Sequence, residues 1–248
     1  MLFAVARNEF LSLFRTPLGW AVLAVSQFLL GLIYFILINL YLNKQQLAVA
    51  VSGVSNEISS TLFGASIYIL MVVTPVLAMR TISYERHRHT IGLLLAAPVH
   101  EAILVLGKFA GLVLYLSLLL ISMLLMNLVL GFATSVDPGL LFTAMFGVLL
   151  IIITFTAISL YISSLTAQPS VAVIGAMGVL LFMFFLSSLA LTRIGWLDDL
   201  INWISLFPHL ESFLQGTLNS LDISYYLLVS SCALILTCLH FQKLRQHG

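Results

Sequence analysis

Long apolar runs alternate with short polar stretches along the whole chain. Six runs lack Asp, Glu, Lys and Arg, and they reach or approach the length that a helix needs to cross a hydrocarbon layer of roughly 30 Å. These runs cover residues 17–41, 62–79, 109–132, 139–165, 170–191 and 225–239, the last being marginal in length. The pattern predicts an all-α integral membrane protein, with six transmembrane helices in a single transmembrane domain over residues 1–248.

The first fifteen residues show a different, amphipathic pattern. One helical face holds the apolar residues Phe3, Ala6, Phe10, Leu13 and Phe14, and the other holds the polar residues Arg7, Asn8, Ser12 and Arg15. An apolar face opposite basic residues is typical of a helix that lies flat at the membrane interface. We therefore expect an interfacial helix before the first span, with a frayed tail as the alternative.

Composition supports the membrane assignment. Hydrophobic residues make up 61% of the 248 residues and charged residues only 8%, whereas soluble domains carry roughly 25% charged residues. This leaves no room for a separate soluble domain. The net charge of +1 gives no reason to expect a nucleic-acid partner.

The few basic residues predict the orientation, because they gather on one side of the predicted topology. That side holds eight of the ten, namely Arg7, Arg15, Arg80, Arg86, Arg88, Lys108, Lys243 and Arg245. The other side holds only Lys44 and Arg193. Since basic loops stay in the cytoplasm, we expect both termini to be cytoplasmic in a multi-pass protein of the plasma membrane.

The stretch from Arg80 to Lys108, which we call the elbow, is the long polar interruption on the cytoplasmic side. It begins with charges, continues as an apolar helical run over residues 91–97, and breaks at Pro98. A charged start beside a leucine-rich face suits docking into the groove of a soluble partner. The alternative is that its basic residues only fix the topology.

On the opposite side, residues 192–224 are too apolar for a plain loop. Apolar residues repeat at helical spacing on both sides of Phe207-Pro208, and each half is too short to cross the membrane. We expect a helical hairpin that re-enters the outer leaflet, with Leu200, Trp203, Phe207, Pro208 and Phe213 as its marker residues. The alternative is a pair of amphipathic helices on the outer surface.

Motifs for chemistry within this chain are missing. The sequence has no G-x-x-x-x-G-K-[ST] phosphate loop, and His100-Glu101 lacks the second His of H-E-x-x-H because position 104 is Leu. Ion-coupled carriers usually place ionisable groups at mid-membrane, and the six runs contain none. We therefore expect neither an enzyme nor a metal site, and any pathway through the spans should suit hydrophobic groups.

Small residues recur at the spacing used in helix packing. Gly107 and Gly111 form a G-x-x-x-G pair at the start of the third span. Such pairs let two helices approach closely. The pair predicts either packing within one subunit or contact with a second copy.

The elbow also carries an ordered pattern, Glu85-Arg86, Thr90, Leu93-Leu94-Leu95, Pro98 and Gly107-Lys108. With this pattern and the six-span layout, the chain resembles the permease subunits of ABC type-2 exporters, and most nearly the gliding-motility and NosY-like permeases. Two positions depart from the family pattern, His89 in place of glycine before Thr90, and Gly92 in place of an acid.

The resemblance implies a membrane dimer with a second permease subunit, identical or different. It also implies two copies of a separate ABC ATPase subunit, which bind the ATP and Mg, so that this chain itself needs no cofactor. The elbow would then be the coupling helix, with contacts from Glu85, Arg86, Arg88, Thr90, Leu93, Leu94 and Pro98. The expected function is export of a hydrophobic or lipid-like substrate across the bacterial inner membrane. The alternative is a mechanical transmitter that passes ATPase strokes to a periplasmic or accessory membrane protein.

Overall fold

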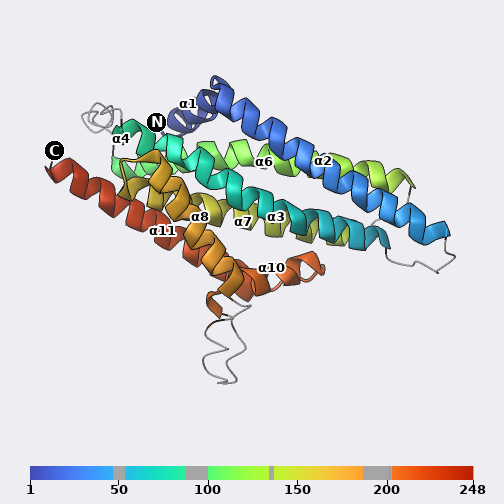
Figure 1. Cartoon of the computed structure of the whole chain (residues 1–248). Coiled ribbons are helices and arrows are strands. Elements are labelled where there is room, and N and C mark those ends of the chain that lie inside the picture. The colour runs from blue at the N-terminus through green and yellow to red at the C-terminus, as the bar shows by residue number, and fades with distance from the viewer. Residues whose placement is uncertain (47–53, 88–99, 134–136, 187–200, 202, 248) are drawn as a thin grey trace.

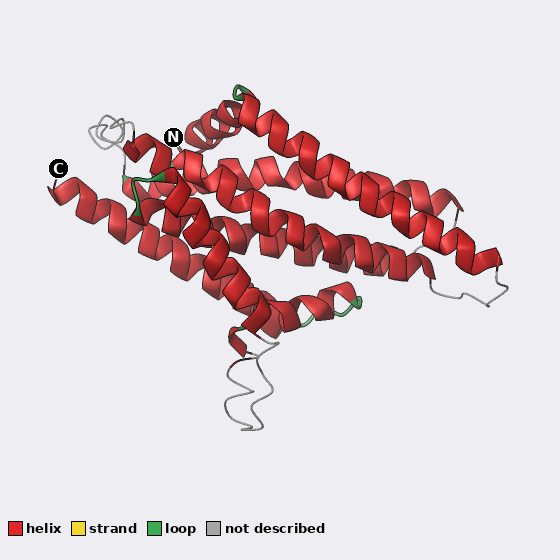
Figure 2. Ribbon diagram, viewed as in Figure 1, coloured by secondary structure: helices red, strands yellow, loops and turns green. Residues whose placement is uncertain are grey.

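The computed structural model describes residues 1–46, 54–87, 100–133, 137–186, 201 and 203–247. Within these residues the chain is a bundle of helices joined by short loops (Figures 1 and 2). The helices are α1 (Leu2–Phe14), α2 (Pro17–Gln46), α3 (Val54–Thr81), α4 (Ser83–His87), α6 (Glu101–Ala133), α7 (Pro138–Leu165), α8 (Pro169–Phe185), α10 (Leu206–Leu214) and α11 (Ser220–His247). The predicted all-α class is confirmed.

Among the described residues, five helices are long and apolar enough to cross a membrane, and they correspond to five of the six predicted runs. They cover Pro17–Leu40, Ile58–His87, Glu101–Gly131, Pro138–Leu165 and Ser220–Arg245. The predicted run over residues 225–239, whose length was marginal for a span, belongs to α11, which has 28 residues. It is longer than its apolar run because polar residues continue the helix at both ends.

The fifth predicted run, 170–191, corresponds to α8. This helix has 17 residues in the described part of the chain, at the lower limit for a membrane-spanning helix. Residues 187–191 of the run lie outside the described residues. A complete sixth span therefore stays a prediction.

The helices begin where the sequence predicts. Pro17, Pro138 and Pro169 are the first residues of α2, α7 and α8, a position where the missing N–H removes no helical hydrogen bond. Asp137 caps α7, since its Oδ1 accepts a hydrogen bond from the Gly139 N–H at 2.8 Å. Asp137 is thus the N-cap of α7.

Helix α7 is the centre of the bundle and α2 lies at its edge. In α7, 67% of the apolar span is buried, against 11% in α2. Helix α7 packs on α3, α6, α8, α10 and α11, whereas α2 leaves large side chains such as Trp20, Phe28 and Phe35 exposed. A helix that is apolar on all sides belongs in a core or a membrane, and α7 lies in the core of this bundle.

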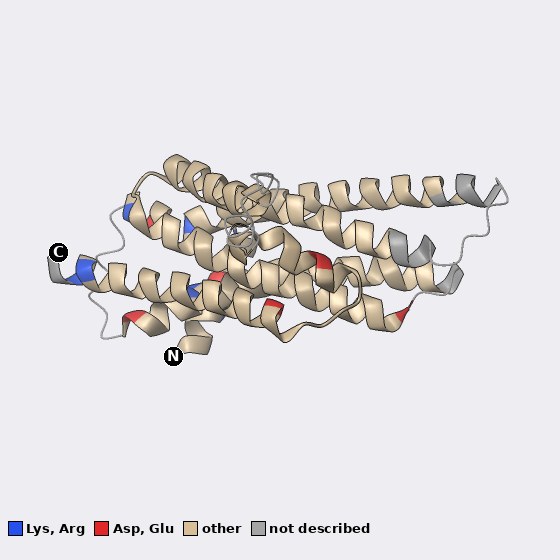
Figure 3. Cartoon of the chain, turned by 90° about the horizontal axis from the view of Figure 1, so that it is seen from below, with Lys and Arg blue, Asp and Glu red and all other residues tan. Residues whose placement is uncertain are grey.

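Both termini lie at the same end of the bundle (Figure 1). Figure 3 shows the blue Lys and Arg segments gathered toward this end, where red Asp and Glu segments also lie, and further red segments toward the middle and the far end. We call the end that holds both termini the basic end. The arrangement supports the orientation that the positive-inside rule predicts.

Candidate functional site

The candidate coupling site lies at the basic end, where α3 ends and the short helix α4 follows. Glu85 and Arg86 belong to α4. The other predicted coupling residues, Arg88, Thr90, Leu93, Leu94 and Pro98, lie outside the described residues. The structure therefore describes the base of the elbow.

Lys108 joins three parts of the chain at this point. Its ammonium donates hydrogen bonds to Glu85 Oε1 and to the Thr81 carbonyl, both at 2.7 Å. It also lies 3.5 Å from Glu9 Oε2. The Lys108 side chain is only 3% exposed, and a charge so buried needs such partners. Helix α6 thereby holds α1, the end of α3 and α4 together.

Serine and arginine side chains fix α4 to the last turn of α7. Arg86 donates a short hydrogen bond to the Ser164 carbonyl. Ser163 Oγ accepts from the Ser83 N–H at 3.1 Å and donates to the Ala78 carbonyl at 3.0 Å. A cation at a helix C-terminus is favoured because the last carbonyls lack helical partners. The start of the elbow is thus anchored to the central helix.

These contacts change the interpretation of Glu85 and Arg86. From the sequence, both belong to a surface that meets a partner. In the structure their charged groups meet Lys108 and the end of α7 within the same chain. We call the assembly of Glu9, Glu85, Arg86, Lys108 and Ser164 the α4 mount, because it holds α4 against the neighbouring helices.

The N-terminal helix packs directly on α6. Ala6 and Leu13 are buried, and a Cβ on Gly107 would lie 2.6 Å from the Val5 side chain. The predicted G-x-x-x-G pair therefore serves packing within one subunit. Ala6 and Leu13 of the predicted apolar face are thus buried against the bundle, whereas Phe3 of the same face is 76% exposed.

On the far side, α10 covers the bundle. Phe213 is fully buried against Gly147 of α7, and Phe207 meets the ring of Phe184 at 5.3 Å between centroids. Trp203 is 61% exposed, and Leu200 lies outside the described residues. Entry of this segment into a bilayer stays a prediction.

The predicted break at Pro208 is wrong in position. Pro208 lies in the first turn of α10, and the helical break occurs at Ser205. A proline in a first turn removes no helical hydrogen bond. Pro208 therefore belongs to the start of α10, the second helix of the predicted hairpin.

A polar cluster, which the sequence did not indicate, fastens α10 to α11. His209 Nδ1 lies 2.7 Å from Asp222 Oδ1, and its Nε2 lies 3.2 Å from the Trp203 carbonyl. The His209 ring stacks on Tyr225. Tyr226 donates a hydrogen bond to the Leu206 carbonyl at 2.9 Å. Asp222 is an acid in the first turn of α11, and this position alone does not identify His209 as its partner.

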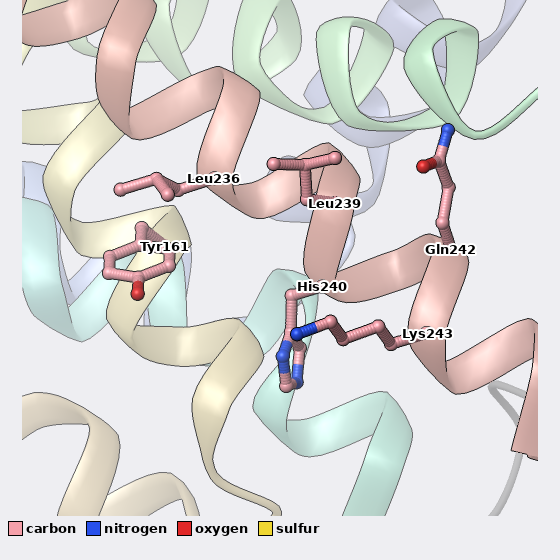
Figure 4. Close-up of a pocket in the computed structure, with 6 residues that line it drawn as sticks. All are labelled: Tyr161, Leu236, Leu239, His240, Gln242 and Lys243. Carbon is pink, nitrogen blue, oxygen red and sulfur yellow. The ribbon is translucent and has the colours of Figure 1, made fainter.

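Two surface cavities accompany these elements. One of about 390 Å³ opens between α7 and α11 at the basic end (Figure 4). The other, of about 410 Å³, lies between α3, α8 and α10, where Tyr68, Phe184, Phe207 and Glu211 are among its lining residues.

In the described part of the chain, no group of three or more His, Cys, Asp and Glu is placed to hold a metal ion.

Comparison with known proteins gives one result that covers nearly the whole chain. The family model described as ABC-2 family transporter protein matches residues 3–239. This range runs from α1 into α11 and includes the whole elbow. No curated protein matches the chain.

Proposed function

Since the chain belongs to the ABC-2 family of transporter proteins, we propose that it is the permease subunit of an exporter driven by separate ATPase subunits. Two ATPase copies and a second permease subunit complete the assembly. It resides in the bacterial inner membrane with both termini in the cytoplasm. Within the family, we assign it to the branch of gliding-motility and NosY-like permeases, on the elbow pattern.

The observation that carries this proposal is the α4 mount. Lys108 and Arg86 connect α4 with α1, α3, α6 and α7. A force applied to the segment after α4 would therefore reach several helices at once. We assign ATPase contact to Arg88, Thr90, Leu93, Leu94 and Pro98, and transmission of the motion to Glu85 and Arg86.

The outer cavity supports a hydrophobic or lipid-like substrate. Aromatic and aliphatic side chains from α3, α8 and α10 form most of its wall, and Glu211 contributes a carboxylate. Binding sites for amphipathic molecules combine apolar walls with a few polar groups in this way. The substrate would meet this wall as it leaves the membrane on the outer side.

A second function, mechanical transmission without solute transport, is favoured by the position of α7. One part of α7 receives Phe213 of α10, and its last turn receives Arg86 of α4. Helix α7 thus contacts both α4 and α10. In this case a periplasmic or accessory membrane protein would bind α10 and no substrate would stimulate ATP hydrolysis.

Co-purification of the ATPase subunit tests the main proposal. We expect Leu94→Asp and Arg88→Glu to lose most of the ATPase, since a reversed or buried charge in a docked contact costs roughly 2–5 kcal/mol. The matched control is Arg7→Glu, a charge reversal on the exposed face of α1 at the same end. If both elbow variants retain a full complement of ATPase with normal turnover, the elbow only fixes topology. Stimulation of turnover by lipid-like compounds then separates export from transmission.

A further inference from the structure

The outer cavity, between α3, α8 and α10, is lined by aromatic rings from all three helices. Tyr68 belongs to α3, Phe184 to α8 and Phe207 to α10. The ring centroids of Tyr68 and Phe184 are 5.5 Å apart, and those of Phe184 and Phe207 are 5.3 Å apart. In the two pairs the ring planes are inclined by 70° and 75°. The three rings thus form an angled wall and not a flat stack.

This wall keeps aromatic surface available to a ligand. Tyr68 and Phe207 are 51% and 38% exposed, whereas Phe184 is buried and supports both rings. The face of an aromatic ring carries partial negative charge, so it attracts a cation that lies over it. Quaternary ammonium ligands are recognised by several rings in this way. The wall therefore favours a positively charged group over an anion.

Glu211 adds a negative charge beside the aromatic wall. It follows Phe207 by four residues on α10, so the two side chains share one face of that helix. Its Oε1 accepts a hydrogen bond from Gln215 Nε2 at 3.1 Å, and Gln215 also lines the cavity. Because an amide is neutral, this bond leaves the negative charge of Glu211 in place. The carboxylate and the ring faces thus favour the same kind of ligand, a cation.

The α3 side of the cavity leaves room for an apolar body. Thr61, Gly64 and Ala65 contribute small side chains to the lining. A Cβ on Gly64 would lie 3.6 Å from the Leu214 side chain, an ordinary contact, so no neighbour crowds this position. The volume of about 410 Å³ falls within the range of roughly 300–1,000 Å³ that small-molecule sites occupy. An ammonium group therefore fits together with part of an apolar body.

We propose that the outer cavity receives a cationic amphiphile, which carries an ammonium or quaternary ammonium group on an apolar body. The cation lies against Tyr68 and Phe207 and pairs with Glu211, while the apolar body lies along α3. The assignment names the substrate class of the exporter, and it rests on the proposed role of this cavity in export. A headgroup with only negative charge is disfavoured, because the carboxylate repels it.

Binding of radiolabelled tetraphenylphosphonium to the purified full-length protein in a neutral detergent tests this proposal. Tetraphenylborate, an anion of nearly the same shape, is the matched probe, and we expect it to bind more weakly. Glu211→Gln and Phe207→Leu should each weaken binding of tetraphenylphosphonium at least about threefold. The amide oxygen of Gln can still accept the hydrogen bond from Gln215, so Glu211→Gln leaves the packing of α10 unchanged.

Two variants on the same side of the bundle control for general effects. Asp137→Asn removes a carboxylate charge at the start of α7 and keeps a residue type that caps helices. Phe142→Leu removes a ring of α7 that is 68% exposed. Both variants should bind tetraphenylphosphonium as the original protein does. An equal loss of binding in these controls would show a general attraction of the cation to the surface and would overturn the proposal.

Two further results would remove the site, namely equal affinity for the two probes and unchanged binding in Glu211→Gln. In the complex with the ATPase, tetraphenylphosphonium should stimulate ATP hydrolysis, and Glu211→Gln should need a higher concentration for the same effect. Binding without stimulation would overturn the assignment as substrate. Because binding is measured without the ATPase, its failure would refute the cation assignment alone. Retention of the ATPase by the elbow variants would refute the coupling proposal alone.

Discussion

At the scale of single residues, Lys108 is the position where a small change has the largest structural consequence. It carries a charge that is almost fully buried, and it is bonded to Glu85 and to the Thr81 carbonyl. Removing one partner of a buried pair leaves the other charge uncompensated, which costs roughly 3–5 kcal/mol. We expect Lys108→Met to lower the thermal unfolding temperature of the purified protein markedly, measured by intrinsic fluorescence in detergent.

The control variant also removes the two carboxylates that Lys108→Met would leave without a partner. The triple variant Glu9→Gln/Glu85→Gln/Lys108→Met leaves no unpaired carboxylate at the α4 mount. It should unfold at a higher temperature than Lys108→Met alone, because neutral amides are cheaper to bury than carboxylates. A triple variant less stable than Lys108→Met would show that the carboxylates do not act through the lysine.

The sequence predicts Lys108 only in part. Its basic charge and its place after Gly107 mark it as a member of the elbow. Its partner Glu9 is 99 residues away along the chain, and no local pattern links two residues at that separation. For the same reason the sequence could not show that Arg86 binds a carbonyl of α7. It instead assigned Glu85 and Arg86 to a surface that meets a partner protein.

At the scale of elements, the packing of α1 on α6 depends on a glycine. A Cβ at Gly111 would lie 2.7 Å from Glu9 Cβ and 2.9 Å from the Ala6 carbonyl oxygen. The backbone oxygen cannot move without shifting α1. We expect Gly111→Ala to destabilise the protein by about 1–3 kcal/mol and to expose the loop between α1 and α2 to limited proteolysis.

Gly131 provides the matched control in the same helix. A Cβ there would meet no atom of the described residues within 4 Å. Alanine also favours a helix over glycine by about 1 kcal/mol. Gly131→Ala should therefore be neutral or stabilising, and similar destabilisation by both variants would contradict the role of close α1–α6 contact.

Element boundaries were predictable where one residue determines them. Proline and Asp137 predict the starts of α2, α7 and α8 because capping depends on local geometry alone. The break before α10 was misplaced by three residues, from Pro208 to Ser205. A proline can either end a helix or occupy its first turn, and only the packing of Leu206, Leu210 and Phe213 into the bundle decides between the two.

At the scale of the whole molecule, α7 relates the two ends of the bundle to each other. Its start is capped on the far side by Asp137, and its last turn holds α4 at the basic end. The sequence predicts α7 as a span but gives no reason to place it at the centre, since several runs are equally apolar. The central position follows from contacts with α3, α6, α8, α10 and α11, which are set by tertiary packing.

The orientation of the bundle yields the last prediction. Asp137 and Lys243 are both exposed but lie toward opposite ends of the bundle. In a background with Cys232→Ser and Cys238→Ser, Asp137→Cys should react with a membrane-impermeant maleimide in intact cells. Lys243→Cys should react only after the membrane is permeabilised, because we propose that the basic end faces the cytoplasm. Labelling of both after permeabilisation shows that each thiol is accessible. Reaction of Lys243→Cys alone in intact cells would reverse the orientation, and with it the cytoplasmic position of the elbow.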